Sequence, residues 1–385
     1  MSEIALVTGG AGFIGSHVVD KLIEKGYHVR VLDNLDPQVH GSLGERKEWP
    51  SYCNGEAEYI LGDIRNKDSF CKALSGVDVV FHLAAAVGVG QSMYKIQHYV
   101  DVNVNGTAVL LDILANEKTI RNRVRKIIVA SSMSNYGEGE YVCPVHGEVF
   151  PQLRSHSQLE KGQWELLCSI KTEPNRTCGE ILTPRATRET KPLYTNSIYA
   201  ITKQTQESTC LTIGEAYRIP AIALRYFNTY GTRQALSNPY TGVAANFSSR
   251  LINHNAPMIF EDGQQQRDFI HISDLIQANM LVLDHEDAHG VYNVGSGKPI
   301  TILEAANIIA NQLESPLRAR VLEEYRMGDI RHCYADISKL KALGYEPKVD
   351  FEMGVKELVS WVGKQKAVDS FDRMKTTLTE RGLTI

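Results

Sequence analysis

The chain has 385 residues, of which 43% are hydrophobic and 22% charged, and its formal net charge is −4. These values are typical of a globular protein with one to three domains. They exclude nucleic acid as a partner, because the sequence has no basic tract. They also exclude a membrane protein, because no apolar run approaches the roughly 20 residues of a membrane helix.

The N-terminal segment enters a strand-like apolar run almost at once. It lacks the basic stretch, apolar core and cleavage site of a signal peptide, so we expect a cytoplasmic protein. From there the pattern alternates between buried strands and amphipathic helices. Strands are predicted at residues 3–8, 28–33, 57–63, 77–85, 124–132 and 219–228, and helices at 16–26, 68–76 and 102–116.

This alternation predicts an α/β fold with a doubly wound, Rossmann-type parallel sheet and helices on both of its faces. We expect a dinucleotide-binding domain over residues 1–228, with an insertion at 138–190. Residues 229–385 are less regular and predict a smaller, mainly substrate-binding α/β domain that is interleaved with the first.

The segment TGGAGFIG joins the first predicted strand to the first helix and places Gly9, Gly12 and Gly15 three residues apart. Glycines in this context let the backbone approach a pyrophosphate, and the helix N-terminus supplies N–H donors. Asp33 ends the second strand, where a carboxylate accepts hydrogen bonds from both ribose hydroxyls of NAD and repels the 2′-phosphate of NADP. The alternative is a glycine-rich turn that binds no nucleotide.

The stretch NSIYAITKQTQE carries Tyr199 and Lys203 four residues apart, on one face of a predicted helix. Alone, this pair could be ordinary surface decoration. The carboxyl ends of parallel strands meet at one edge of a sheet, however, and the strand before it ends in Ser131 and Ser132. We therefore expect a serine, a tyrosine and a lysine in one cleft, with Lys203 and an oxidised nicotinamide lowering the pKa of Tyr199.

Several ordered motifs resemble the extended short-chain dehydrogenase/reductase family, and more narrowly its NAD-dependent sugar-nucleotide epimerase/dehydratase branch. They are TGGAGFIG, Asp33, GDIR, HLAA, SSMSNYG, YAITK and RYFNTYG. The resemblance implies Ser132, Tyr199 and Lys203 as catalytic residues and a nucleotide sugar as substrate. By analogy it also implies a homodimer.

The resemblance further implies a set of binding residues. For NAD they are Gly9, Gly12, Phe13, Ile14, Gly15, Asp33, Asn34, Asp63, Ile64, Leu83, Ala84, Ala85, Asn103, Ser131, Tyr199, Lys203 and Tyr226. For the sugar nucleotide they are Ser132, Asn228, Arg233, Arg267 and Arg331, where the last two arginines suit a diphosphate.

Met133 and Ser134 follow Ser132, where the dehydratases of the family place Asp-Glu and the decarboxylating branch usually keeps a Glu. Neither side chain works as an acid or base near neutral pH, so elimination is disfavoured. The chemistry that remains is 4-epimerisation through a transient 4-keto sugar. A reductase of the same fold, which exchanges its cofactor, and a dinucleotide sensor without catalysis are the alternatives.

The insertion contains Cys143, His146, Cys168 and Cys178. A Cys₃His set suits structural, tetrahedral Zn²⁺, and the alternative is cysteines that pack as small apolar side chains. The odd total of seven cysteines argues against a disulfide framework. The CPVHG and WELLC segments are similar to the dTDP-L-rhamnose 4-epimerase-like group, which favours a dTDP-6-deoxyhexose substrate over UDP-glucose or UDP-galactose.

Overall fold

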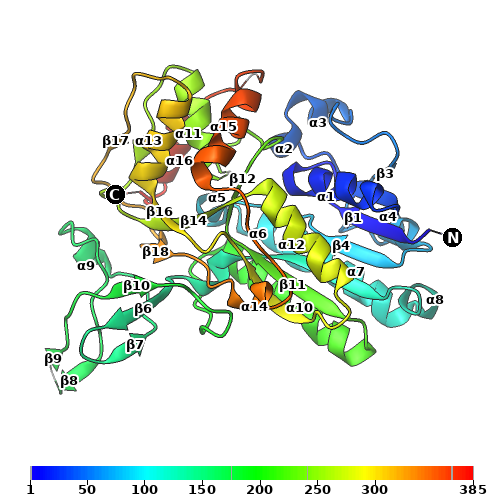
Figure 1. The fold of residues 1–385 in the computed structure, drawn as a ribbon, viewed down its shortest axis with the longest axis horizontal. Helices are drawn as coiled ribbons and strands as arrows, with labels where there is room; N and C mark the ends of the chain where they lie inside the picture. The colour runs from blue at the N-terminus through cyan, green and yellow to red at the C-terminus, as the bar shows by residue number, and fades with distance from the viewer. Residues whose placement is uncertain (1, 175, 241, 366, 385) are drawn as a thin grey trace.

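The computed structural model of the protein describes residues 2–174, 176–240, 242–365 and 367–384. At its centre is a parallel sheet of seven strands in the order β15-β11-β5-β4-β1-β2-β3 (Figure 1). The strands are β1 (Ile4–Thr8), β2 (His28–Asp33), β3 (Glu58–Leu61), β4 (Val79–His82), β5 (Lys126–Ser132), β11 (Ala221–Tyr226) and β15 (Gly290–Val294). The predicted doubly wound sheet is therefore confirmed.

Helices cover both faces of the sheet because successive strand residues point to opposite sides. Ala5 and Val7 of β1 belong to the core that also contains α1 and α12. Leu6 belongs to the opposite core, with α4 and α7. The main helices of these two layers are α1 (Phe13–Glu24), α4 (Lys67–Leu74), α7 (Gly106–Asn116), α10 (Ile198–Tyr217), α12 (Ile272–Asp284) and α14 (Ser338–Lys341).

A third core lies beyond the carboxyl ends of the strands, where α11 (Val243–Ile252), α13 (Ile302–Gln312) and α15 (Phe351–Val362) pack together. It is accompanied by small sheets of β12 (Asn228–Tyr230), β14 (Gln266–His271), β16 (Pro299–Thr301) and β18 (His332–Cys333), and of β13 (Met258–Ile259) and β17 (Arg320–Val321). Between α12 and α13 the chain crosses back to the large sheet, where β15 pairs with β11.

The insertion forms a separate lobe, at the lower left in Figure 1. Its antiparallel sheet has the order β10-β6-β7, and its own small core contains Tyr141, Cys143, Leu166, Cys168 and Leu182. Its elements are β6 (Glu140–Cys143), β7 (Gly147–Val149), α9 (His156–Leu159), β8 (Lys171–Glu173), β9 (Arg176–Thr177) and β10 (Thr183–Arg185).

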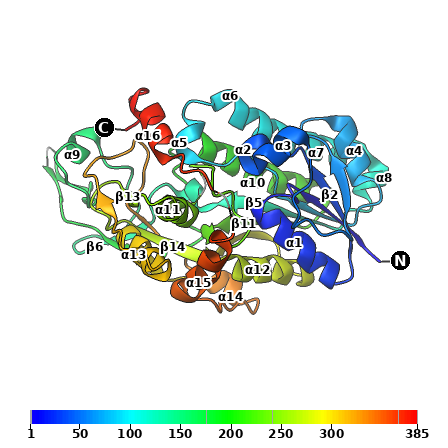
Figure 2. The ribbon, with the colours of Figure 1, turned by 90° about the horizontal axis from the view of Figure 1, so that it is seen from above.

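The last helix, α16 (Phe371–Thr379), lies beside α5 (Val89–Ser92) at the open end of the sheet (Figure 2). The remaining short elements are α2 (Pro37–His40), α3 (Ser42–Arg46), α6 (Ile96–Tyr99), η1 (Val100–Asn105), α8 (Lys118–Arg121) and η2 (Met133–Tyr136). Within the described ranges, no helix combines the length and apolar character that crossing a bilayer requires.

Candidate active site

One cavity of about 640 Å³ runs along the carboxyl ends of the central strands. Its walls come from the β1–α1 loop, the ends of β2, β4, β5 and β11, the start of α10, and residues 258–261, 326–330 and 371–383. The volume lies in the range of small-molecule sites. The cavity therefore occupies the place where open α/β sheets bind their ligands.

The glycine loop forms one end of this cavity. Gly9 has a φ of +70°, which a side chain would strain, and Gly12 begins α1 without a capping side chain. The first turn of α1 carries no acidic residue. This helix end, with its N–H groups uncapped by a side chain, suits a pyrophosphate.

Asp33 is held in place at the end of β2. Its two carboxylate oxygens accept hydrogen bonds from the backbone N–H groups of Ala11 (3.1 Å) and Leu35 (2.9 Å). The side chain lines the cavity, and each oxygen keeps a second lone pair that can accept from a hydroxyl. The geometry therefore fits the ribose contact expected from the sequence.

The loop after β4 is braced by two buried side chains that the sequence did not single out for this role. Thr8 Oγ1 accepts from the N–H groups of Leu83 and Ala84, each at 3.1 Å, and lies 3.0 Å from His82 Nδ1. Burial lowers the pKa of His82 to about 3, so its imidazole is neutral at physiological pH. The sequence signal that could have indicated this role is the pair of polar residues, Thr8 and His82, at the ends of adjacent strands.

Ser132, Tyr199 and Lys203 line the middle of the same cavity. Ser132 ends β5, and Tyr199 and Lys203 lie in the first two turns of α10, whose N-cap is Ser197. Lys203 is 3% exposed, and its Nζ donates to Gln206 Oε1 at 2.9 Å. The structure thus brings together the three predicted catalytic side chains.

Burial sets the proton affinities of this group. It raises the pKa of Tyr199, which the contact with the Ser132 hydroxyl partly offsets, and it lowers the pKa of Lys203 to about 8. The sequence had predicted a lowered pKa for Tyr199 from the ammonium of Lys203. In this structure desolvation outweighs that effect, and the ammonium is engaged by Gln206.

Three of the residues predicted to contact ligands, Asn103, Arg233 and Arg331, lie outside the cavity wall. Asn103 bonds to the backbone of Ala86 and to Thr202, so it braces the wall from behind. Arg233 forms an ion pair with Asp20 of α1 at 2.7 Å. The other residues predicted for NAD and for the sugar nucleotide, including Asn228 and Arg267, do line the cavity.

Arg331 is the main correction. Its side chain is 1% exposed and donates to three carboxylates, those of Glu165, Glu261 and Asp262. A guanidinium already saturated by carboxylates is not available to a diphosphate, so its predicted role does not fit the structure.

Arg326, in the same RMGDIRH segment, lines the cavity in its place. Its guanidinium lies 4.6 Å from the ring centre of Phe260 and donates to Asp329 at 2.8 Å. Sequence reasoning missed it because the segment offers two arginines, and only the burial of each distinguishes them. Gln265 and Asn246 are further polar groups of the wall that the sequence did not suggest.

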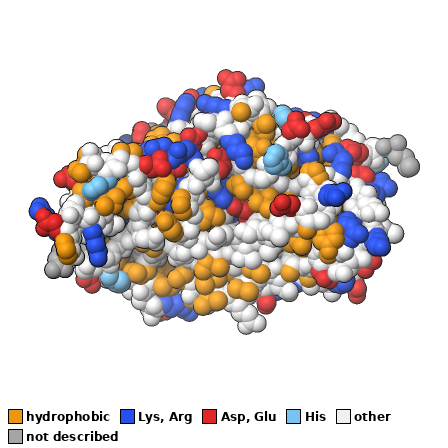
Figure 3. Space-filling view, turned by 90° about the horizontal axis from the view of Figure 1, so that it is seen from below, with side chains coloured by type: hydrophobic (Ala, Val, Ile, Leu, Met, Phe, Trp, Pro, Cys, Tyr) orange, Lys and Arg blue, Asp and Glu red, His pale blue; other side chains and the backbone are white. Residues whose placement is uncertain are grey.

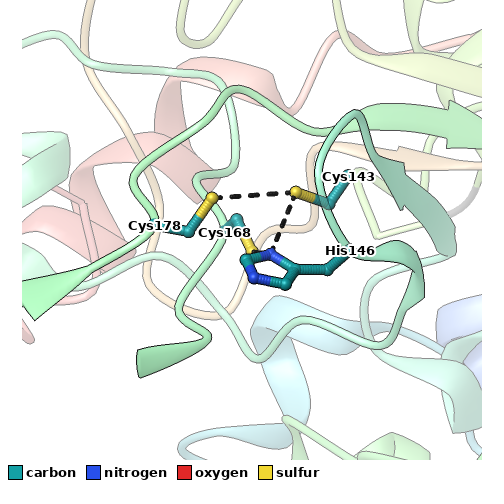
Figure 4. Close-up of side chains that lie close together, drawn as sticks. All are labelled: Cys143, His146, Cys168 and Cys178. Carbon is teal, nitrogen blue, oxygen red and sulfur yellow. Dashed lines mark hydrogen bonds between the residues drawn. The ribbon is translucent and has the colours of Figure 1, made fainter. Parts of the chain in front are cut away.

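The four predicted metal ligands converge in the insertion, with all four ligand atoms within 4.8 Å of one another (Figure 4). Cys143 Sγ lies 3.8 Å from Cys178 Sγ, and His146 Nδ1 lies 3.5 Å from the sulfur atoms of Cys143 and Cys168. Tetrahedral zinc with ordinary bond lengths requires about 3.8 Å between sulfurs and about 3.6 Å between sulfur and nitrogen. The donor set therefore fits zinc, and Nδ1 is the nitrogen of His146 that faces the sulfur atoms.

Comparison with known proteins identifies the class. The model of the NAD dependent epimerase/dehydratase family matches residues 5–157 and 177–295. A dTDP-L-rhamnose 4-epimerase of Burkholderia thailandensis is 34% identical and is covered over 95% of its length, by 94% of this chain. The chain belongs to the NAD dependent epimerase/dehydratase family.

Two solved structures share the fold over 94% of this chain and 99% of their own. One is a UDP-glucose 4-epimerase of Thermotoga maritima with UDP-glucose, at 30% identity and a TM-score of 0.72. The other is a UDP-glucuronic acid 4-epimerase of Bacillus cereus in complex with UDP-glucuronic acid and NAD, at 26% identity and a TM-score of 0.73. These neighbours confirm the Rossmann-type fold and support NAD as the cofactor.

Proposed function

We propose that this protein is a nucleotide-sugar 4-epimerase that inverts C4 through a transient 4-keto sugar and keeps its NAD bound. The observation that carries the proposal is the arrangement of Ser132, Tyr199 and Lys203 in the same cavity as the glycine loop and Asp33. One end of the cavity suits a dinucleotide, and the middle suits proton transfer beside it.

Bound NAD would supply the hydride chemistry at C4, and the 4-keto sugar must turn over between the two transfers so that the opposite face of C4 is reduced. Tyr199 takes the proton of the C4 hydroxyl and gives it back after the second transfer, so no proton or electron is consumed overall. Ser132 hydrogen-bonds the same oxygen. Lys203 supplies positive charge that lowers the pKa of the phenol once the nicotinamide adds its own charge.

Elimination of water from the sugar is disfavoured because the carboxylates of the cavity wall lie at its dinucleotide end or are paired with arginines. Among the described residues of the wall, these carboxylates are Asp33, Asp36, Asp63, Glu261 and Asp329. The first three belong to the dinucleotide end, Glu261 is paired with Arg154, and Asp329 with Arg326. Beside Ser132 the wall presents Met133 and Ser134 instead, so a dehydratase lacks its acid and base.

A dTDP-6-deoxyhexose is the proposed substrate. The similarity to the Burkholderia enzyme supports it, and so do the apolar side chains of Met133 and Phe227 beside Ser132 and Asn228. UDP-glucose is the second candidate, since a UDP-glucose 4-epimerase shares the fold at 30% identity. In either case we assign the diphosphate to Arg267 and Arg326, which both line the cavity.

Proton NMR in D₂O with UDP-, dTDP-, GDP- and CDP-sugars, without added cofactor, tests the function. Inversion at C4 without deuterium incorporation supports an epimerase, and the sugar that responds names the substrate. Deuterium at C5 or loss of the 6-hydroxyl contradicts the proposal. Turnover only of a keto sugar, and only after addition of NAD(P)H, establishes the reductase instead.

We also propose that Cys143, His146, Cys168 and Cys178 hold a structural zinc ion. The distances support it, as does the small core of the insertion, which alone is a weak basis for a stable fold. The 3.8 Å between two sulfurs is far longer than the roughly 2.05 Å of a disulfide.

Metal analysis tests the zinc site without reference to activity. We expect about one zinc per chain by mass spectrometry, and a thiolate–cobalt absorption band after Co²⁺ replacement. Cys178→Ser should lose most of the metal, and Cys71→Ser, a cysteine outside the cluster, should keep it. A purified protein that contains no zinc and takes none up from zinc sulfate contradicts the proposal.

A homodimer is the proposed assembly. Ile96, Val100 and Ile201 are 50%, 41% and 46% exposed, on α6, η1 and α10, and these elements contact one another. Exposed apolar groups on adjacent helices suit a second copy. The face in Figure 3 mixes hydrophobic with charged side chains. Light scattering should give twice 42.9 kDa, and Val100→Asp should halve that mass.

A further inference from the structure

Arg154 extends from the insertion into the wall of the active-site cavity. Its side chain is 1% exposed and makes a bidentate ion pair with Glu261, through Nη1 and Nη2, each at 2.8 Å. Nη1 also donates to the Trp164 carbonyl at 3.0 Å, and Nη2 donates to the Asp329 carbonyl at 3.2 Å. One guanidinium thus joins the insertion to two separate segments of the wall.

Both of these wall segments carry groups that face the cavity. Glu261 is next to Phe260, and Asp329 holds Arg326 over the ring of Phe260. The two segments also touch through their backbones, because the Glu261 N–H donates to the Glu324 carbonyl at 2.7 Å. A displacement of Glu261 or Asp329 therefore moves the aromatic ring and the arginine together.

Glu261 itself needs an external partner. It has a φ of +57°, in the left-handed region, and is 1% exposed. A residue other than glycine is strained in this conformation, which persists only where the surroundings fix it. A buried carboxylate also requires a counter-charge, which Arg154 supplies together with Arg331 at 3.2 Å.

A second contact from the same part of the insertion supports this arrangement. Glu165 accepts from Arg331 Nε at 3.0 Å and lies 3.1 Å from His332 Nε2. Arg154 and Glu165 both lie between His146 and Cys168, two of the four clustered ligands. The segment of the insertion that contacts the cavity wall is therefore flanked in the sequence by two residues of the cluster.

We propose that Arg154 is a positioning residue for the nucleotide diphosphate, and that the insertion fixes Phe260 and Arg326 through it. This inference rests on the proposed function of the cavity. The insertion then contributes to binding of the sugar nucleotide indirectly, because the described part of the insertion places no charged group against the ligand in the middle of the cavity. Ser132, Tyr199 and Lys203 lie outside these contacts, so the chemical step is independent of Arg154.

Two variants test the proposal. Arg154→Lys keeps the charge, but the three N–H groups of an ammonium cannot make the four hydrogen bonds of the guanidinium. The double variant Arg154→Met/Glu261→Gln removes both members of the buried pair. Glu138, 4.0 Å from Arg154 Nε, keeps the hydrogen bonds that it accepts from the Arg331 backbone N–H and the Tyr141 hydroxyl, so the protein should fold. Arg188→Met is the matched control, because Arg188 pairs with Glu140 and Glu148 within the insertion.

The measurements are calorimetric titration with UDP and with dTDP, the KM and kcat for the sugar that responds by NMR, and the NAD content. We expect the Kd and the KM to rise about tenfold in both Arg154 variants, as for the loss of one well-aligned charged hydrogen bond. The kcat should stay within threefold of the wild type and the NAD content should be unchanged. Arg188→Met should behave as the wild type.

An unchanged Kd in both folded Arg154 variants overturns the proposal, and so does an equal rise in Arg188→Met. A fall in kcat with unchanged KM overturns it as well, because the effect would then lie in the chemistry. If the wild type inverts no sugar nucleotide, the proposed function fails, but the affinities for UDP and dTDP still decide the role of Arg154.

Discussion

Gly15→Ala tests the tight packing of the glycine loop against α1. A Cβ at Gly15 would lie 2.2 Å from the Gly9 carbonyl oxygen and 2.8 Å from the Gly10 Cα. Ordinary carbon–oxygen contacts are about 3.3 Å or longer, so the helix or the loop must move by about 1 Å. Both contacts are backbone atoms, which cannot turn aside as a side chain can. We expect a destabilisation of about 3 kcal/mol, at the upper end of overpacking effects.

Gly12→Ala is the matched comparison. A Cβ there meets only the Gly9 carbonyl oxygen, at 3.3 Å, and otherwise faces open space. The fold should therefore be unaffected, but the methyl group occupies the cavity where a pyrophosphate must approach the backbone. We expect NAD content to fall about tenfold or more, with stability close to that of the wild type.

Thermal and urea unfolding of NAD-free protein separates these effects, because bound NAD would itself stabilise the fold. Gly15→Ala should lower the Tm by about 5 °C, and Gly12→Ala by less than about 1 °C. NAD is measured separately, by chromatography of the extract from freshly purified protein. A Gly15→Ala protein that melts with the wild type, or a Gly12→Ala protein that keeps all of its NAD, refutes the reasoning.

Three further predictions concern the site. Tyr199→Phe should keep the fold and the bound NAD. In the NMR assay its kcat should fall at least about 100-fold, because among the described residues of the cavity wall no other group is assigned to take the hydroxyl proton. Full activity of this variant would exclude the mechanism. Arg326→Met should raise KM about tenfold with little change in Tm. Arg331→Met should instead lower the free energy of unfolding in urea by about 3–5 kcal/mol, because it leaves buried carboxylates unpaired. The reverse pattern would restore the diphosphate-binding role first predicted for Arg331. The pKa of Lys203 is lowered by burial from 10.5 to about 8, so the charged form destabilises the NAD-free fold at pH 7 by roughly 3 kcal/mol, and this cost disappears as the pH rises from 8 to 10.5. Lys203→Met should therefore be more stable than the wild type in urea at pH 7 but not near pH 10.5, and a less stable variant at pH 7 would contradict this sign.

The fold could be predicted from the sequence because its signals are local. Short continuous apolar runs predicted buried strands such as β1, and TGGAGFIG placed the turn between a strand and a helix. The i, i+4 spacing predicted that Tyr199 and Lys203 share one face of a helix. Both line the same cavity because this helix starts at Ile198 and its first turns form part of the cavity wall.

The pairing of distant groups could not be predicted in the same way. Arg326 and Arg331 are chemically equal in the sequence, and only the three carboxylates that gather around Arg331 from two segments decide which arginine reaches a ligand. The apolar wall formed by Phe371, Met374 and Leu378 also escaped notice, because the helix α16 that carries them meets the cavity only through tertiary packing.

The place of β15 in the sheet has a consequence for how the chain is made. This strand lies beside β11, although the elements β12, α11, β13, β14 and α12 separate the two along the sequence. While the protein leaves the ribosome, β11 is therefore an open edge, with unpaired N–H and C=O groups, until residue 294 has emerged. A chain ended after β11 would keep that edge, so the nascent N-terminal half depends on its own later residues to be protected from aggregation.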